Sequence, residues 1–546
     1  MSKSKKFLLS IFSGVLLSLA WPPLPFFPLL FIGFLPILWL DDICSESKKS
    51  ARSFFGYSYL ALLIWNFGTT WWVGATYFGT HDISTAIAGL LANTLNPLLM
   101  CIPLVAFHNT KKRFGPAWGY ISLPAYWITF EFFHLRWDLS WPWLTLGNGL
   151  ACFPQVIQWY EFTGVLGGTL WILAVNIVLY RLLYPFLSGR SYLFRKKNLL
   201  PEILLIVLPV ALSLNQYFPY TEIGKRQHVV IVQPNIDPYM KFAEGTEDAQ
   251  LDVLIRLSIE NIDSTTDYLV WPETAIPQGI LVNELSFDPT IEKVRKAFSS
   301  FPDLKIVTGI NAYKRYETDS TPTARKDSDN GKVFYWDAFN SAIQLDSSRN
   351  IPIYHKSKLV PWVEKMPYPK FFKFLEPLAL NMGGITGSLG SQEQRSVFFG
   401  PDSVGIAPEI CYESIYGEYS NEYVRRGANL FFVITNDGWW GNTAGHKQHL
   451  EYARLLAIET RRDIAQAANT GTSAFINQRG DIRRATPWWT PVAIRANLRV
   501  NDRETFYVRF GDYIGRAAII LTLLLFVWAM IVRFRKRKVI GELRVP

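Results

Sequence analysis

The stretch AAIILTLLLFVWAMIVR, residues 517–533, is apolar until its last residue. A helix needs about 20 mostly apolar residues to cross the hydrocarbon core of a bilayer, so this stretch predicts a membrane span near the end of the chain. Seven further runs of this kind precede it, at roughly 7–20, 24–40, 53–80, 84–108, 115–135, 163–186 and 198–216. The sequence therefore predicts eight spans, with one long polar stretch between the seventh and the eighth.

The composition of the whole chain agrees with a membrane protein. Of its 546 residues 49% are hydrophobic and only 18% are charged, whereas soluble domains carry about 25% charged residues. Its aromatic content and four cysteines exclude a disordered chain and a disulfide scaffold. The first apolar run resembles a signal peptide, but WPPLP follows it instead of a small-residue cleavage site. We therefore expect this run to be retained as a span.

The net charge of +10 lies mainly in the short segments that flank the spans. If the N-terminus is cytoplasmic, 20 Lys and Arg lie in cytoplasmic segments and one, Arg136, lies in the short loops on the other side. The positive-inside rule then places residues 217–516 outside the cytoplasm, in a periplasm or its equivalent. The basic charge belongs to the cytoplasmic flanks, so nucleic acid is not implied. We predict a membrane domain over 1–216, an exported domain over 217–516, and an eighth span with a basic tail over 517–546.

The exported stretch alternates strand-like runs with helix-like runs. The β-branched runs lie at 228–233, 268–271, 304–308, 404–407 and 429–434, and the helical ones at 246–263, 287–298 and 446–460. Such alternation predicts an α/β architecture. The run 333–346 is followed by another at 351–361, which predicts an antiparallel hairpin and hence a mixed sheet. The polar piece 316–332 predicts a solvated loop.

Three chemically useful residues each follow a strand-like run. Glu273 lies in YLVWPETAIP, Lys356 in IYHKSKLVPWVEKMP, and Cys411 in VGIAPEICYES. A thiol has a reference pKa of about 8.5 and reacts as the thiolate. A carboxylate can take its proton, and an ammonium group can favour the anion and stabilise the oxyanion of a tetrahedral intermediate. An acid, a cation and a thiol together predict acyl transfer.

Each of these residues also has a simpler interpretation. A single glutamate after a strand is more often a surface residue. Lys356, close to Lys358, could be a solvated charge that protects a sheet edge. On the exported side only Cys152 and Cys411 could meet, and a lone exported cysteine is either a buried small hydrophobe or a reactive thiol.

Two other catalytic patterns are weaker. His446 and His449 in HKQH could be taken for metal ligands, but the spacing is i, i+3 and no third ligand is evident. Solvated or capping histidines are favoured over a metal site. No G-x-S-x-G sequence occurs, so a Ser–His–Asp hydrolase is not indicated.

Taken together, these segments resemble the nitrilase superfamily, whose signature is a Glu–Lys–Cys triad in that order on an α-β-β-α sandwich. The fuller resemblance is to the apolipoprotein N-acyltransferase family within it. WPETAIP, YHKSKLVPWVE, ICYES and ITNDGWWG are similar to its blocks, in its order. The layout of seven spans, a domain and one more span is similar too. The resemblance implies a multi-pass protein of the bacterial inner membrane with a nitrilase-like catalytic domain in the periplasm.

The resemblance also implies roles for individual residues. Glu273 would be the general base, Lys356 the oxyanion-stabilising cation and Cys411 the nucleophile. The family's supporting residues correspond to Glu364, Tyr412 and Glu413, and substrate contacts are expected at Phe242 and Trp362. Phe242 stands near the place of a family tryptophan, and PWVEKMP replaces a more usual Pro-Phe-Gly-Glu.

The reaction implied by the resemblance has two steps. A phospholipid would donate its sn-1 acyl chain to Cys411, leaving a thioester and a lysophospholipid. The α-amine of a diacylglyceryl-cysteine at the start of an apolipoprotein would then attack the thioester. We expect no metal or organic cofactor. The expected partners are the phospholipid donor, the lipoprotein acceptor and membrane lipids, and we expect a monomer.

The arm 361–380 mixes aromatic residues with lysines, which suits a membrane interface. We predict that it covers the site and touches lipid, with an ordinary packed loop as the alternative. The residues concerned are Trp362, Lys365, Tyr368, Lys370, Phe371, Phe372, Lys373 and Phe374.

Three rival functions remain open. A transporter would bury ionisable residues in its spans, and here the spans contain few, with Glu131 and His134 near the end of the fifth. A polytopic transferase of lipid-linked sugars could use an acid such as Asp82. A membrane-tethered nitrilase-type amidase would share the triad but has no evident need for eight spans.

Overall fold

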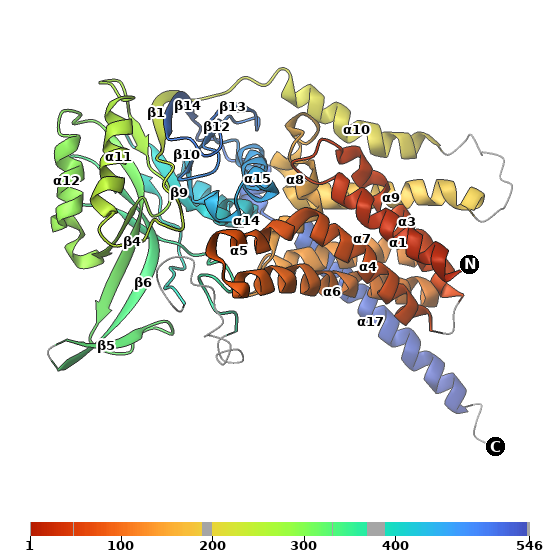
Figure 1. Cartoon of the computed structure of the whole chain (residues 1–546). Coiled ribbons are helices and arrows are strands. Elements are labelled where there is room, and N and C mark those ends of the chain that lie inside the picture. Colours follow the sequence, from red (N-terminus) through yellow and green to blue (C-terminus); the bar gives the residue numbers. More distant parts are fainter. Residues whose placement is uncertain (1, 47–48, 188–198, 330, 369–387, 543–546) are drawn as a thin grey trace.

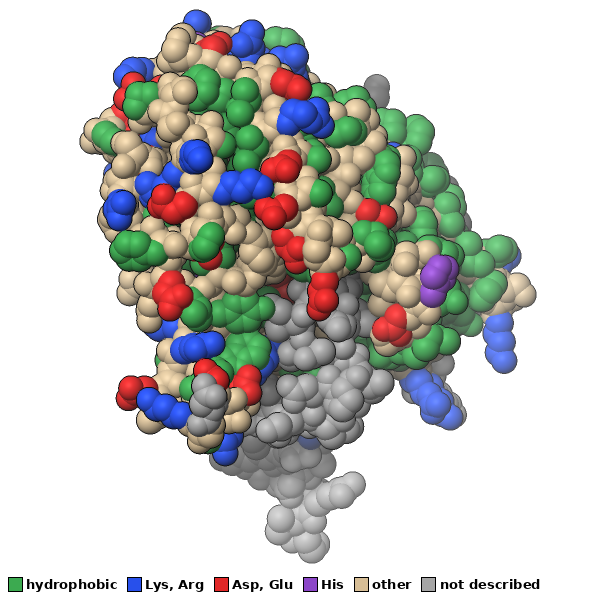
Figure 2. Space-filling view, turned by 60° about the vertical axis from the view of Figure 1, so that its left-hand side comes forward, with side chains coloured by type: hydrophobic (Ala, Val, Ile, Leu, Met, Phe, Trp, Pro, Cys, Tyr) green, Lys and Arg blue, Asp and Glu red, His purple; other side chains and the backbone are tan. Residues whose placement is uncertain are grey.

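The computed structural model describes residues 2–46, 49–187, 199–329, 331–368 and 388–542. The chain forms a bundle of helices on one side and a pair of sheets on the other (Figure 1). Both ends of the chain lie on the helical side, at the end of the bundle away from the sheets. Charged side chains of both signs are spread over the part that contains the sheets, whereas hydrophobic side chains gather over the helices behind it (Figure 2).

Helices occupy all eight predicted spans. They are α1 (Lys3–Leu19), α3 (Leu35–Ser45), α4 (Ser50–Thr70), α6 (Ile83–Phe114), α7 (Pro116–His134), α9 (Val165–Leu187), α10 (Leu199–Tyr217) and α17 (Tyr513–Glu542). Among the described residues, five stretches are long and apolar enough to cross a membrane: Phe27–Ser45, Ile83–Phe114, Val165–Leu187, Leu199–Tyr217 and Tyr513–Arg533. The runs that became α1, α4 and α7 fall short of that length or hydropathy, so the number of eight spans stays a prediction.

The third predicted run, 53–80, is not one continuous helix. The helix α4 ends at Thr70, and the 3-10 turn Trp71–Thr76 and the short helix α5 (Tyr77–Thr80) follow it. Gly89 of α6 allows this turn to lie close to the helix, because a β-carbon on Gly89 would lie 2.4 Å from the Cα of Gly74. An apolar run marks burial but not the point at which the chain changes direction.

The helical bundle buries several ionisable residues. Glu131 accepts hydrogen bonds from Trp127 Nε1 (2.9 Å), the Leu146 amide (2.7 Å) and Thr169 Oγ1 (2.7 Å). Asp41, which is also fully buried, contacts His108 Nδ1 at 2.5 Å and Lys111 Nζ at 2.8 Å. Burial of charged groups is tolerated where they pair with one another.

The remaining chain builds two sheets. In the first, strands run in the order β14-β1-β2-β4-β6-β5, with β3 beside β4 and β7 beside β6; in the second the order is β13-β12-β11-β10-β9-β8. The strands of the first sheet are β1 (Lys225–Gln233), β2 (Tyr268–Val270), β3 (Ile276–Leu281), β4 (Lys305–Tyr316), β5 (Arg325–Asp329), β6 (Lys332–Leu345), β7 (Ile353–His355) and β14 (Val492–Val500). Those of the second are β8 (Phe398–Phe399), β9 (Gly405–Ile410), β10 (Leu430–Thr435), β11 (Ile464–Ala468), β12 (Ala474–Ile476) and β13 (Ile482–Ala485).

The two sheets pack face to face between two layers of helices. Along β1, Val229 and Ile231 join the core shared with the second sheet, while Val230 and Val232 join the core under the outer helices. Alternate residues of a strand point to opposite faces, which is why residues 229–232 of β1 are all apolar. The helices α11 (Glu247–Ile259) and α12 (Pro289–Ala297) cover the first sheet, and α14 (Gly417–Arg425) and α15 (Ala444–Thr460) cover the second. The predicted α-β-β-α sandwich is present.

Most predicted elements of this part were correct. All five strand-like runs are strands, the three helical runs are α11, α12 and α15, and β6 pairs with β7 as an antiparallel hairpin. The predicted loop 316–332 was wrong, because β5 runs from Arg325 to Asp329 and pairs with β6. The residues of β5 are polar and have a low strand propensity, so the sequence alone does not predict a strand there. The strand forms because its backbone pairs with that of β6.

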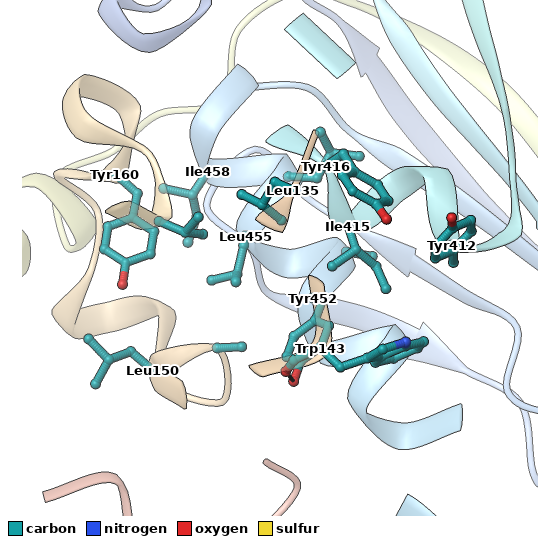
Figure 3. Close-up of a cluster of buried hydrophobic side chains, with 14 of the residues drawn as sticks. Leu135, Trp143, Leu150, Tyr160, Tyr412, Ile415, Tyr416, Tyr452, Leu455 and Ile458 are labelled. Atoms are coloured by element: carbon teal, nitrogen blue, oxygen red, sulfur yellow. Dashed lines mark hydrogen bonds between the residues drawn. The ribbon is translucent and has the colours of Figure 1, made fainter. Parts of the chain in front are cut away.

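The helix α15 joins the sandwich to the helical bundle. Trp21 Nε1 donates to Tyr452 Oη at 3.0 Å, and Gln448 Nε2 donates to the carbonyl groups of Pro22 (2.9 Å) and Thr69 (3.0 Å). Around these bonds, Tyr452, Leu455 and Ile458 of α15 lie in one buried cluster with Trp143, Leu150 and Tyr160 (Figure 3). The sandwich is thus held directly against the helical bundle.

Candidate active site

The three residues singled out in the sequence lie just past the ends of strands. Glu273 lies three residues beyond β2, Lys356 directly follows β7, and Cys411 directly follows β9. The strand β2 runs parallel to β1 and β4, and β9 runs parallel to β10. Carboxyl ends of parallel strands meet at one edge of a sheet, where α/β proteins place reactive groups.

Lys356 is the centre of the polar contacts. It is 1% exposed, and its Nζ lies 3.2 Å from Glu273 Oε1 and 2.9 Å from Glu364 Oε1. Asn340 Nδ2 donates to the same two oxygens, at 2.6 Å and 3.1 Å. Both Oε1 atoms are therefore occupied, which leaves Oε2 of Glu273 to take up a proton. The interpretations of Glu273 as a surface residue and of Lys356 as a solvated edge charge are both wrong.

The charges around the site set the protonation of its members. Burial lowers the pKa of Lys356, but the carboxylates of Glu273 and Glu364 raise it well above its usual range. Burial raises the pKa of the Cys411 thiol, and the charge of Glu273 raises it further, while Lys356 and a hydrogen bond from Thr435 lower it. The resting site therefore holds an ammonium group and a neutral thiol, so the thiol needs a base before it can react.

Cys411 occupies a strained backbone position. Its φ is +57°, in the left-handed region that residues with a β-carbon rarely adopt. A 3-10 turn, Cys411–Ile415, begins there. The Cys411 carbonyl accepts hydrogen bonds from Ser414 Oγ and His449 Nε2, both at 3.1 Å. Such strain persists only where neighbours hold it, and it is typical of active sites.

His449 is buried and paired with Asp437. Its Nδ1 lies 2.9 Å from Asp437 Oδ1, which also accepts from Thr435 Oγ1 at 2.7 Å. Its Nε2 lies 3.1 Å from both the Cys411 carbonyl oxygen and Ser414 Oγ. Burial lowers the pKa of His449, but Asp437 raises it above its usual 6.5. Both His446 and His449 are buried, so the expectation that they are solvated or capping residues was wrong.

We expect His449→Gln to destabilise the protein in a pH-dependent way. The variant leaves Asp437 without its cation in the core, which costs roughly 3–5 kcal/mol of the free energy of unfolding. Because the folded state raises the pKa of His449, this contribution is complete below pH 6.5 and is lost as the pH rises through the folded value. Melting in detergent at pH 5.5 and pH 8.5 measures the difference, which we expect to shrink at pH 8.5.

The matched control is His446→Gln, one turn earlier on α15. Burial lowers the pKa of His446 to about 4, and its Nε2 contacts Asn442 at 3.1 Å. It is therefore neutral at both pH values, and its loss should cost the same at each. A His449→Gln deficit that is equal at the two pH values would contradict a charged His449.

Glu413 ties the loop of Lys356 to the loop of Cys411. Its Oε1 accepts from the amides of Ser357 (2.8 Å) and Lys358 (2.9 Å) and its Oε2 accepts from the Ile410 amide (2.9 Å). The hydroxyl groups of two tyrosines also donate to Oε1: Tyr354 and Tyr419. Tyr412 Oη donates to the carbonyl of Leu359 at 2.8 Å and makes a second tie between the loops.

The two predicted substrate contacts lie on loops beside the triad. Phe242 is half-buried and follows Lys241, whose fully buried Nζ donates to the carbonyl of Glu273 at 2.8 Å. Burial lowers the pKa of Lys241 to about 7. Trp362 is half-buried, with φ of +69°, and its amide donates to the carbonyl of Lys365 at 2.8 Å.

The predicted lipid-facing arm is described only as far as Tyr368. Its members Lys370, Phe371, Phe372, Lys373 and Phe374 lie outside the described residues. In the described part, Lys365 Nζ pairs with Asp138 at 2.9 Å, and the Tyr368 amide donates to the same carboxylate at 3.1 Å. The base of the arm is thus attached to the chain just after α7.

Cys152 and Cys411 do not pair, since all four cysteines are free. Among the described residues, no group of three or more His, Cys, Asp and Glu side chains is arranged to hold a metal.

Sequence reasoning missed Asn340, Lys241 and the Asp437–His449 pair. Asp437 lies inside the family-like block ITNDGWWG. The resemblance of this block could therefore have pointed to Asp437, but no role was assigned to this residue from the sequence. Asn340 lies inside β6 and Lys241 in a loop after β1, and neither has a local pattern that marks it.

Two family models match the chain. Residues 13–178 match the apolipoprotein N-acyltransferase N-terminal domain, and residues 229–505 match carbon-nitrogen hydrolase. Together the models cover the helical bundle as far as α9 and the whole sandwich.

Curated relatives match over nearly the full length. The chain is 30% identical over 549 residues to the apolipoprotein N-acyltransferase of Chlorobaculum tepidum, covering 98% of each chain. It is 27% identical to that of Geobacter metallireducens, covering 94% of this chain and 93% of the relative. Among solved structures, an amidase from Nesterenkonia sp. is similar at 14% identity and a TM-score of 0.33, over 53% of this chain and 94% of the amidase.

Proposed function

This chain belongs to the apolipoprotein N-acyltransferase family, and from this premise we propose that it transfers the acyl chain through a thioester on Cys411. The donor is a phospholipid, and the acceptor is the α-amine of a diacylglyceryl-cysteine at the start of an apolipoprotein. The observation that supports this most is the contact of Lys356 with Glu273 and Glu364 beside a strained cysteine.

In the first step Cys411 attacks the sn-1 ester of the donor. Glu273 Oε2 takes the thiol proton as the sulfur bonds to the ester carbonyl carbon, and the Lys356 ammonium group stabilises the oxyanion that forms. The carbon–oxygen bond of the ester then breaks. The leaving glycerol oxygen takes the proton from Glu273, so the lysophospholipid departs with a free hydroxyl group and the thioester remains.

In the second step the amine of the acceptor attacks the thioester. Glu273 takes a proton from the attacking amine, Lys356 again faces the oxyanion, and the carbon–sulfur bond breaks. The proton returns to the sulfur of Cys411, and an amide is released. One base and one cation serve both steps in turn, because each step moves one proton to the carboxylate and back.

The described surroundings favour this function over the rivals. Asp82, the acid suggested for a sugar transferase, is exposed and caps α6, where it accepts from the Ser84 amide at 2.9 Å. A helix cap accounts for an aspartate at this place. A tethered amidase would not need α15 to pack on the helical bundle, as it does through Gln448 and Tyr452. Lipid substrates account for this contact, because they stay anchored in the bilayer and the active site must therefore be held next to it.

We further propose eight spans, both termini in the cytoplasm of the bacterium, and the sandwich in the periplasm next to the inner membrane. The charge bias of the flanking segments supports this orientation. The enzyme acts as a monomer.

Cysteine labelling tests the orientation. In a background with the four native cysteines replaced by Ala, we introduce Ser299→Cys, which lies just after α12, or Glu46→Cys, which lies just after α3; both positions are exposed. A membrane-impermeant maleimide applied to intact spheroplasts should label the first and reach the second only after lysis. Labelling of Glu46→Cys before lysis would place this residue outside the cytoplasm and contradict the proposed topology.

The transfer itself is tested by its products. Purified enzyme in mixed micelles, given a phospholipid labelled in the sn-1 chain and a diacylglyceryl-peptide with a free α-amine, should release lysophospholipid and N-acylated peptide in equal amounts. Release of free fatty acid without N-acylated peptide would instead support an amidase-type hydrolase.

A further inference from the structure

Lys358 is a half-buried cation near Lys356 in the sequence, and it forms no ion pair with any residue that the structure describes. It lies two residues after Lys356, and its amide is held by Glu413 Oε1 at 2.9 Å. Its ammonium group lies 4.9 Å from the centre of the Tyr416 ring. In the part of the chain that the structure describes, no carboxylate or carbonyl accepts a hydrogen bond from this ammonium group. A cation removed from water without such a partner is costly.

Among the described residues, the charged groups near Lys358 are cations or carboxylates that already have partners. Burial lowers its pKa to about 8, and Arg395, Arg136 and Lys365 lower it too, with Glu413 as the opposing charge. Glu413 is already occupied by five hydrogen bonds. The other cations each have carboxylates of their own: Arg136 pairs with Glu418 and Asp512, Lys365 with Asp138, and Arg395 with Glu422.

The ring and the charges near the Lys358 ammonium group belong to segments next to the start of a candidate span. Tyr416, whose ring it contacts, directly precedes α14. Glu418 in the first turn of α14 pairs with Arg136, and Arg136 also pairs with Asp512, one residue before the span Tyr513–Arg533. The ammonium groups of Lys356 and Lys358 lie over neighbouring rings, 6.0 Å from the centre of Tyr412 and 4.9 Å from the centre of Tyr416. Tyr412 and Tyr416 lie side by side at the edge of the buried cluster (Figure 3).

A phospholipid carries an anion at the matching place. Its phosphate is bound to the third carbon of the same glycerol whose first carbon bears the reacting ester. When that ester faces Lys356 and Cys411, the phosphate lies one glycerol unit away, and the two lysines are separated by one residue. Ammonium groups are common ligands of phosphate in proteins.

We propose that Lys358 binds the phosphate group of the donor phospholipid and so selects phosphate-bearing donors in the first step. This inference rests on the proposed function, because it assigns part of the donor site. The acceptor's diacylglyceryl group carries no phosphate, so Lys358 takes no part in the second step.

The test compares two donors that share the same ester. Acylation of Cys411 is followed in single turnover with phosphatidylglycerol and with 1,2-diacylglycerol of the same chains, in micelles of a neutral detergent. A charge-assisted hydrogen bond is worth about 1.5–3 kcal/mol, so Lys358→Met should lower the ratio of phospholipid to diacylglycerol rates at least tenfold. Lys358→Arg keeps the charge and should leave the ratio within about threefold of wild type. Lys293→Met is the matched control, because Lys293 is a lysine of α12 on the far face of the sandwich.

The ratio does not depend on how much of a variant is folded, because both donors use the same active molecules. An unchanged ratio in Lys358→Met overturns the phosphate site, whatever the absolute rates. The rate at which the acyl-enzyme passes its chain to the acceptor peptide should be unchanged in Lys358→Met; an equal loss in both steps also overturns it. If wild-type enzyme forms no acyl-enzyme from phospholipid, the proposed function itself fails, and the phosphate site with it.

Discussion

Replacing Glu273 with glutamine should lower the rate of acyl-enzyme formation about 1,000-fold at pH 7. The amide keeps the shape of the side chain and can still contact Lys356, but it cannot accept the thiol proton. The same change removes a negative charge that raises the pKa of Cys411. The thiol of Glu273→Gln therefore ionises at lower pH than in wild type, and the deficit should shrink as the pH rises. Stopped-flow release of lysophospholipid between pH 6 and pH 9.5 measures this.

The control for this prediction is Glu247→Gln, at the start of α11 on the covering layer of the first sheet. It removes one carboxylate of the same chemistry and should leave the rate unchanged. If Glu273→Gln keeps more than about a tenth of the wild-type rate at pH 7, another group serves as the base.

Replacing Lys356 with methionine should affect both the rate and the stability. Loss of one oxyanion-stabilising donor costs about 100-fold to 1,000-fold in rate, and the thiol loses the cation that lowers its pKa. The carboxylates of Glu273 and Glu364 are left facing one another without a cation. Breaking a buried pair in this way destabilises a protein by roughly 3–5 kcal/mol. Rates and melting in the same detergent measure the two effects.

The double variant Lys356→Met, Glu364→Gln separates the two effects. It removes one of the two facing carboxylates, so much of the lost stability should return, while the rate stays low because the cation is still absent. Recovery of the rate together with stability would mean that Lys356 only holds the fold and does not face the oxyanion.

The elements that the sequence predicted correctly are those with a local signal. Apolar runs and flanking charges mark helices without reference to the rest of the chain, and the β-branched runs before Glu273 and Cys411 mark strands in the same way. The triad could be named because each member follows such a run within a family-like block. The residue types of the triad predict that an acid, a cation and a thiol act together, but they do not predict which atoms are in contact.

The features that were missed depend on residues far apart in the sequence. Asn340 reaches Glu273 and Glu364 because β6 lies beside β4, and the charge of His449 depends on Asp437 at the end of another strand. The strand β5 forms because β6 offers a free edge, although its own residues are polar. Asp41 lies just past the predicted span 24–40, and only the packing of α3 against α6 shows that it is buried with His108.

The most direct test of the central claim is the intact mass of the purified protein after exposure to phospholipid alone. Without an acceptor the second step cannot proceed, so the thioester should accumulate. We predict an added mass equal to one acyl chain, removed by hydroxylamine at neutral pH and absent in Cys411→Ala. Transfer to acceptor peptide with no such adduct on Cys411, or an adduct that persists in Cys411→Ala, would contradict the account.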